Sequence, residues 1–221
     1  MISDRLNKIS QFIKDDHDVA DIGSDHGLLL VLLNNRNFKN NVLGVENKIG
    51  PFDNLKKTIC SINKPNFSCD LSNGLENVSP NYQTIVIAGM GFSNIKEIVL
   101  NDIKNGNKRD TFIIDCHTNQ DEVRKFFYEI GYKISDETII LEDSIYYDVI
   151  CFALNNDKTS YSSKELEFGP FNLKRKSDIF IKRYTVQLNK LKQIKLSIKN
   201  ESRIKEIDQK INKLEEIIDE N

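Results

Sequence analysis

The sequence lacks several features that would fix a protein's location or chemistry at once. No stretch of its 221 residues approaches the roughly 20 consecutive apolar residues that a membrane-spanning helix needs. The first five residues lack the apolar core of a secretion signal. The scattered cysteines form no C-x-x-C pair, so we expect reduced thiols and no zinc site at Cys60, Cys69, Cys116 and Cys151. We therefore expect a cytoplasmic protein with no membrane partner and no metal.

Two nucleotide-binding fingerprints are also missing, G-x-G-x-x-G and the P-loop pattern G-x-x-x-x-G-K-[ST]. Residues 19–27 instead combine a short strand, a turn with Gly23 and Gly27, and the start of an apolar helix. Asp21 at the strand end would repel a phosphate but suits a cationic or hydroxyl-rich ligand. S-adenosylmethionine (AdoMet) carries an amino group, a sulfonium and a ribose, and fits this turn. The alternative is an ordinary strand-to-helix turn that needs glycine for backbone reasons only.

Strand and helix signals alternate over the first two thirds of the chain. We expect an N-terminal helix at 3–14 with Ser3 as a possible N-cap, and strands that begin near residues 19, 42, 66, 84 and 111. The intervening helices are expected from Pro51 to about 62, at 93–101 and at 121–130. Segments 132–140 and 146–154 have no helix between them and predict a hairpin with a turn near 142–144. This order predicts an α/β class: a Rossmann-like sheet of the class I AdoMet-dependent methyltransferase type, over residues 1–155.

The last third of the chain changes pattern after a polar segment at 155–163, which suits a linker. Two apolar stripes follow at alternating spacings of three and four residues, and their phase breaks near 199–202, where Ser202 could cap a new helix. We predict that residues 156–221 comprise this linker and an antiparallel coiled-coil hairpin. A single long helix that dimerises is the competing interpretation.

Positive charge is concentrated in one segment. Residues 174–205 hold eleven Lys or Arg against two acids, a net charge of +9, so the remainder of this chain of net charge −2 carries −11. Such asymmetry favours contact with a polyanion, although a solvated lysine-rich helix face is the alternative.

Residues at successive strand ends offer complementary chemistry, because ligands of such sheets bind beyond the carboxyl ends of the strands. Glu46 can accept hydrogen bonds from ribose hydroxyls, Asn73 can pair with an adenine edge, and the glycines after the fourth strand allow close approach of a reacting base. Each has a structural alternative: a solvated strand end for Glu46, a turn for Asn73-Gly74, and a core position for Met90. The predicted cofactor-binding residues are Asp21, Gly23, Ser24, Glu46, Asn73, Gly74, Ala88 and Gly89.

The motifs Asp-Ile-Gly-Ser-Asp-His-Gly at 21–27 and Ile-Val-Ile-Ala-Gly-Met-Gly at 85–91, with Gly50-Pro51 and Asn73-Gly74-Leu75, resemble the bacterial tRNA (adenine-22)-N1-methyltransferase family, the TrmK type. The resemblance extends from Ser3-Asp4-Arg5-Leu6 to Phe168-Gly169-Pro170 and so covers nearly the whole chain. The chain departs from the family at Leu28-Leu29-Leu30, at Phe92 and at Ile114-Asp115-Cys116-His117. At the last of these, His117, or Asn119 after a local shift, stands for the asparagine usual in the family.

The resemblance implies methyl transfer from AdoMet to N1 of adenine 22 in the D-arm of tRNA. Asp25 and His26 would orient the base or shuttle a proton, with a backbone-bonded His26 as the alternative, and Met90 and His117 complete the implied catalytic set. Arg5 would contact RNA phosphate or close a salt bridge. The implied phosphate-binding residues of the basic segment are Lys174, Arg175, Lys176, Lys182 and Arg183.

The expected partner is tRNA, bound by a monomer, with dimerisation through the coiled coil as an alternative. Two other functions remain open at this stage. One is a methyltransferase of the same fold that acts on another RNA or a small molecule. The other is a non-catalytic RNA-binding protein.

Overall fold

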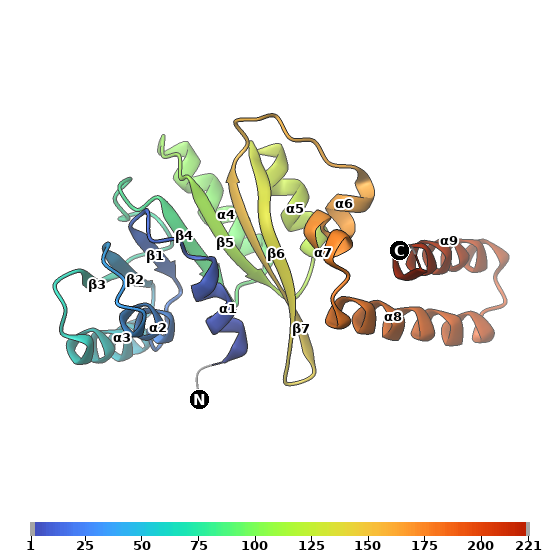
Figure 1. Ribbon diagram of the computed structural model, residues 1–221, viewed down its shortest axis with the longest axis horizontal. Helices are drawn as coiled ribbons and strands as arrows, with labels where there is room; N and C mark the ends of the chain where they lie inside the picture. Colours follow the sequence, from blue (N-terminus) through green and yellow to red (C-terminus); the bar gives the residue numbers. More distant parts are fainter. Residues whose placement is uncertain (1–2, 220–221) are drawn as a thin grey trace.

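The computed structural model describes residues 3–219. Their strands form one seven-stranded sheet in the order β3-β2-β1-β4-β5-β7-β6 (Figure 1). The first five strands are parallel, and β7 runs antiparallel to both β5 and β6. The predicted α/β sheet that ends in an antiparallel hairpin is therefore confirmed. The strands are β1 Val19–Ile22, β2 Val42–Glu46, β3 Phe67–Leu71, β4 Thr84–Ala88, β5 Thr111–Cys116, β6 Tyr132–Glu142 and β7 Ile145–Leu154.

Helices cover both faces of the sheet, because alternate residues of a strand point to opposite sides. On β4, Ile85 and Ile87 enter one core with α4 and α5, whereas Val86 enters the other core with α1, α2 and α3. Both cores are continuous and apolar, as expected for a parallel sheet buried on its two faces. The covering helices are α1 Asp4–Phe12, α2 Leu28–Asn35, α3 Ile49–Ile62, α4 Phe92–Lys104 and α5 Gln120–Glu129.

Two helix starts show how local chemistry sets these boundaries. The side chain of Ser3 accepts a hydrogen bond from the Leu6 amide and caps α1, as predicted. Helix α3 begins at Ile49, two residues before the predicted start at Pro51. Proline fits there because the first amides of a helix have no partner within it, so the missing N–H costs nothing.

The C-terminal region is helical: α6 Ser163–Phe168, α7 Pro170–Arg175, α8 Asp178–Ser197 and α9 Glu201–Asp219. Helices α8 and α9 run side by side in opposite directions, away from the sheet (Figure 1). Their apolar faces form a third core with Ile139 of β6 and Phe168 of α6. The coiled-coil packing and the boundary at residue 155 stay predictions.

The predicted cap of the last helix is wrong. Helix α9 begins at Glu201, and the side chain of Asn200 accepts a hydrogen bond from the Arg203 amide at 3.1 Å. Asn200 is therefore the capping residue, and Ser202 lies inside the first turn. Asparagine serves this role as well as serine does, and the two lie only two positions apart.

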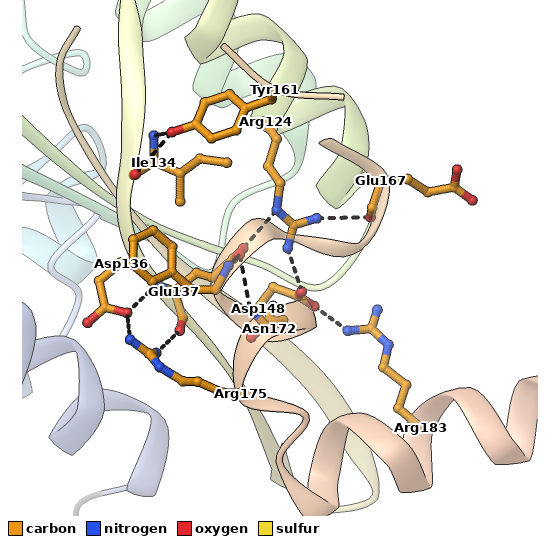
Figure 2. A network of polar contacts seen from close by, with 11 residues as sticks. Arg124, Ile134, Asp136, Glu137, Asp148, Tyr161, Glu167, Asn172, Arg175 and Arg183 are labelled. Atoms are coloured by element: carbon orange, nitrogen blue, oxygen red, sulfur yellow. Dashed lines mark hydrogen bonds and ion pairs between the residues drawn. The ribbon is translucent and has the colours of Figure 1, made fainter. Parts of the chain in front are cut away.

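A buried network of charges joins the sheet to the C-terminal helices (Figure 2). Arg124 of α5 donates to Glu137 Oε2 of β6 at 2.9 Å and to Asp148 Oδ1 of β7 at 3.1 Å. The same guanidinium donates to the Glu167 carbonyl of α6, and Asp148 also pairs with Arg183 of α8. Two strands and two C-terminal helices thus share one network of ion pairs and hydrogen bonds, which fixes how the helical region meets the sheet.

Candidate active site

A pocket opens at the carboxyl edge of the parallel strands and has a volume of about 360 Å³. It is bounded by the turn after β1, the end of β2, the loop after β3 and one face of α4. The structure brings five of the predicted site residues into this lining: Gly23, Glu46, Asn73, Gly74 and Met90. Met90 therefore faces the pocket while it also packs against the core, so its two interpretations are compatible.

Helix α4 supplies a part of the pocket that the sequence analysis missed. Asn94, Glu97 and Asn101 line it, together with Ile98. Their spacing of three and four residues places them on one helix face. The sequence signal for these pocket residues is a polar stripe with helical spacing, directly after the glycine-containing turn at 89–91.

Glycine is favoured at Gly23 because the backbone there is in a left-handed conformation, and the turn also passes close to the flexible end of the Met90 side chain. Its φ of +76° lies in the left-handed region, and an added Cβ would stand 2.5 Å from Met90 Cε. The backbone of the first turn thus approaches the pocket without a side chain in between, as a bound ligand would require.

The two acids at the strand ends occupy different positions. Glu46 lines the pocket, and its carboxylate accepts a hydrogen bond from the Asp25 amide. Asp21 is buried outside the lining and accepts a hydrogen bond from Ser24 Oγ at 2.8 Å. Burial raises the pKa of Asp21 to about 6, although the Ser24 hydroxyl opposes the rise. The buried Asp21 and Ser24 side chains therefore stabilise the turn and do not line the pocket.

The raised pKa of Asp21 predicts that Asp21→Asn stabilises the ligand-free protein at neutral pH. The folded state favours the protonated carboxyl, so this group's contribution to stability is complete below pH 4 and is lost as the pH rises through 6. A shift of about two pKa units corresponds to about 3 kcal/mol. We expect Asp21→Asn to raise the free energy of unfolding by up to that amount at pH 7.5, and by little at pH 4.

Denaturant titrations at both pH values check this expectation. Asp53→Asn, at an exposed position of α3, is the matched control and should not change the free energy of unfolding at either pH. A gain from Asp21→Asn that is equal at pH 4 and pH 7.5 would show that the ionisation of Asp21 is not its cause.

Asp25 and His26 lie at the mouth of the first turn, with side chains 63% and 61% exposed. Their Oδ2 and Nε2 atoms are 3.8 Å apart. The alternative of a backbone-bonded His26 side chain has no such hydrogen bond among the described residues; instead, the His26 carbonyl oxygen accepts a hydrogen bond from Thr58 Oγ1 at 2.8 Å. Both side chains are thus accessible to a ligand that approaches this edge.

The remaining candidates lie around the ends of β4 and β5. Ala88 ends β4, and Gly89 follows it with a φ of +74°. His117 is exposed after β5, and its ring centroid is 6.0 Å from that of Tyr147. Asn119 is the N-cap residue of α5, and its side chain donates to Glu122 at 2.7 Å, so of the two alternatives His117 is the one beside Tyr147.

The structure sorts the candidate RNA contacts into two kinds. Arg5 pairs with Asp115, Arg183 pairs with Asp148, and Arg175 donates to Asp136 at 2.6 Å, so all three arginines have carboxylate partners within the protein. Lys174 and Lys182 are exposed, and Lys176 is half-buried. Of the predicted phosphate contacts, the two exposed lysines are therefore the most available.

Neither a membrane span nor a metal site is found within residues 3–219. No described helix is long and apolar enough to cross a bilayer. No group of three or more described His, Cys, Asp or Glu side chains could hold a metal ion.

Comparisons with known proteins converge on one family. The model described as "TrmK: tRNA (adenine(22)-N(1))-methyltransferase" matches residues 19–217. A tRNA (adenine(22)-N(1))-methyltransferase from Bacillus subtilis (strain 168) is 27% identical over 234 residues, covering 99% of this chain and 97% of that protein. The crystal structure of the B. subtilis m1A22 tRNA methyltransferase TrmK aligns with a TM-score of 0.83 and 26% identity over 99% of both chains. The structure of M. capricolum TrmK in complex with S-adenosyl-homocysteine aligns with a TM-score of 0.85 and 28% identity, over 99% of this chain and 98% of that one.

Proposed function

Because this chain belongs to the tRNA (adenine(22)-N(1))-methyltransferase family, TrmK, we propose that it transfers a methyl group from AdoMet to N1 of adenine 22 in tRNA. One observation carries the proposal: the family match spans the strand ends whose side chains converge on the pocket. Fold alone would not suffice, since one fold serves many reactions.

The pocket has the donors and acceptors that AdoMet needs. Glu46 is placed to accept hydrogen bonds from the ribose hydroxyls, and Asn73 to pair with the adenine edge. At Gly23 the backbone of the turn can contact the cofactor directly, because no side chain lies between them. The turn is supported by the hydrogen bond between the buried Ser24 and Asp21 side chains. When bound, AdoMet supplies the methyl group: the N1–carbon bond forms as the carbon–sulfur bond breaks, and the electron pair stays on sulfur.

The protein's task in this reaction is alignment and charge stabilisation. Adenine N1 has an in-plane lone pair, so it needs no deprotonation before it attacks, and the product ring is a cation near neutral pH. Gly89 allows the base to approach the pocket closely, while Asp25 and Glu46 provide negative charge near the developing cation. The base must leave its stack to reach this edge.

The basic C-terminal helices are proposed to hold the tRNA phosphates through their exposed lysines. We expect the triple change Lys174→Gln, Lys182→Gln, Lys190→Gln to weaken tRNA binding and to make its salt dependence shallower by about one logarithmic unit per lost phosphate contact. The AdoMet affinity should not change, because these positions lie outside the pocket. Binding of tRNA at several salt concentrations measures this.

Substitutions test this role better than truncation does. Phe180 and Tyr184 of α8 pack against Phe168 and Ile139, so removing α8 would uncover part of the core. Lys57→Gln, at an exposed position of α3, is the control. An unchanged salt slope in the triple variant would reject a phosphate-binding role for α7 and α8.

A methylation assay tests the function itself. The full chain is incubated with AdoMet and total tRNA, and the modified nucleotide is mapped. We expect 1-methyladenosine at position 22 and no transfer to a tRNA with guanosine there. Methylation elsewhere in RNA, or of a small molecule, would favour a different methyltransferase. Binding of tRNA without transfer would favour a non-catalytic protein.

The setting of this activity is also a proposal. We propose a cytoplasmic protein that acts as a monomer. Dimerisation through α8 and α9 is the alternative, and sedimentation of the full chain distinguishes the two.

A further inference from the structure

A cluster of charged and aromatic side chains lies beside Gly89, outside the pocket lining. Arg5 of α1 pairs with Asp115 at the end of β5, and its guanidinium carbon stands 4.8 Å from the centroid of the Tyr147 ring. The ring of His117 meets Tyr147 edge-on. In the sheet, Asp115 is the neighbour of Ala88, so the cluster adjoins the turn that separates it from the pocket.

Gly89 opens directly onto this cluster. Apart from its chain neighbours, a Cβ built on Gly89 would have Arg5 Nη1, at 3.8 Å, as its only neighbour within 4 Å among residues 3–219. The next residue, Met90, lines the pocket. One short turn thus contacts the pocket through Met90 and Arg5 through Gly89, so the cluster and the pocket are adjacent.

Asp115 carries unused hydrogen-bonding capacity. The side chain is 1% exposed, and its Oδ1 atom accepts no hydrogen bond from the described residues. Burial raises the pKa of Asp115, while Arg5 and the Gly89 amide oppose the rise. A buried acceptor without a partner is costly, so it points to a donor that is supplied from outside.

The side chain now held by Asp115 is a planar cation. The Arg5 guanidinium presents N–H donors to the carboxylate and a flat face to Tyr147. An adenine methylated at N1 is also a planar cation, with an exocyclic N–H donor at its edge. The cluster therefore suits the product ring, and the transition state that precedes it, better than neutral adenine.

We propose that Tyr147, Asp115 and His117 form the subsite for the target adenine, and that Arg5 occupies this subsite until the base displaces it. The inference rests on the proposed function and names the base-binding part of the same site. Tyr147 is the stacking platform, and Asp115 accepts from the exocyclic amine. The displaced Arg5 is then available to a tRNA phosphate, the contact expected for it from the sequence.

A purely structural role is the competing explanation. Arg5 approaches Glu142 Oε2 at 3.8 Å, and the Asp4 amide donates to Glu142 Oε1 at 2.9 Å, so the cluster also holds α1 against the sheet. If that is its whole purpose, substitutions will change thermal stability but will not distinguish one nucleoside from another.

Nucleoside binding to the full chain separates the two explanations. Chemical shift titrations use 1-methyladenosine and adenosine with the wild type, Arg5→Met and Asp115→Asn. We expect Arg5→Met to bind 1-methyladenosine at least about tenfold more tightly than adenosine. Without Arg5, the Asp115 carboxylate and the Tyr147 ring have no cation of their own and favour the cationic nucleoside over the neutral one. Asp115→Asn should lose this preference. An Arg5→Met protein that binds both nucleosides equally, or neither, overturns the proposal.

Turnover of Tyr147 variants is the second arm and does not depend on α1. Tyr147→Leu should lower kcat/KM for tRNA roughly 10- to 100-fold, as expected for loss of a stacked base. Tyr147→Phe should restore it to within about threefold, and the AdoMet Kd should be the same in both variants. Wild-type turnover in Tyr147→Leu overturns the proposal. A wild-type protein that methylates no adenine N1 in tRNA defeats the proposed function instead.

Discussion

Replacing Arg124 with methionine is expected to lower the free energy of unfolding by about 3–5 kcal/mol. Arg124 is 1% exposed and is paired with Glu137 and Asp148, which are themselves buried (Figure 2). Methionine has a similar apolar volume but cannot donate, so Glu137 loses its ion-pair partner in a dry environment. The Glu167 carbonyl loses a hydrogen bond as well. Asp148 keeps Arg183, which limits the loss.

Urea or thermal unfolding of the full chain measures this effect. Lys125→Met is the matched control on the same helix, because Lys125 is exposed and its pair with Asp121, at 3.6 Å, contributes at most about 1 kcal/mol. A second variant, Arg124→Met with Glu137→Gln, should recover part of the stability, since no unpaired charge then remains at Glu137. An Arg124→Met protein within about 1 kcal/mol of the wild type would show that the network is solvated.

The sheet could be predicted because each strand is recognisable from its own local sequence. The strands are short apolar runs bounded by turn residues, so burial and local pattern agree along the chain. Helices α6 and α7 have six residues each and are too short to show a period. Their signals were instead the capping box of Ser162 and Glu165 and the proline at the start of α7. Ser162 lies in the polar segment that predicts a linker, and there a capping signal is easily hidden among other polar residues.

The pocket could be predicted in part for a related reason. Parallel strands end at one edge, so Glu46 and Asn73 were certain to be near each other. The cluster around Asp115 could not be found in that way, because Arg5 lies 110 residues away in the sequence and on a helix outside the strand order. The net charge of residues 174–205 likewise includes Arg183, although Arg183 forms an ion pair with Asp148 of β7. A charge count within one segment cannot show a partner that is distant in the sequence.

Replacing Asp25 with asparagine is expected to lower turnover at least about 100-fold while the AdoMet Kd stays within about threefold. The backbone of Asp25 adjoins the pocket, since its amide donates to Glu46, which lines it, but its side chain is exposed at the mouth of the turn. Its φ of +47° is one that asparagine tolerates, so the substitution removes the charge and keeps the amide in place. Asp25→Ala should have the same effect on turnover with some added backbone strain.

Calorimetric titration with AdoMet and single-turnover transfer to tRNA separate the two functions of this residue. Asp53→Asn removes another exposed carboxylate, from α3, and should leave both the AdoMet affinity and the rate of transfer unchanged. If the AdoMet affinity of Asp25→Asn falls in parallel with turnover, the Asp25 carboxylate contributes to AdoMet binding beside Glu46 and not to the transfer step alone. If turnover is kept, the developing charge on the base is balanced by other groups, and of the described carboxylates buried at this edge Asp115 is the one with an oxygen that accepts no hydrogen bond.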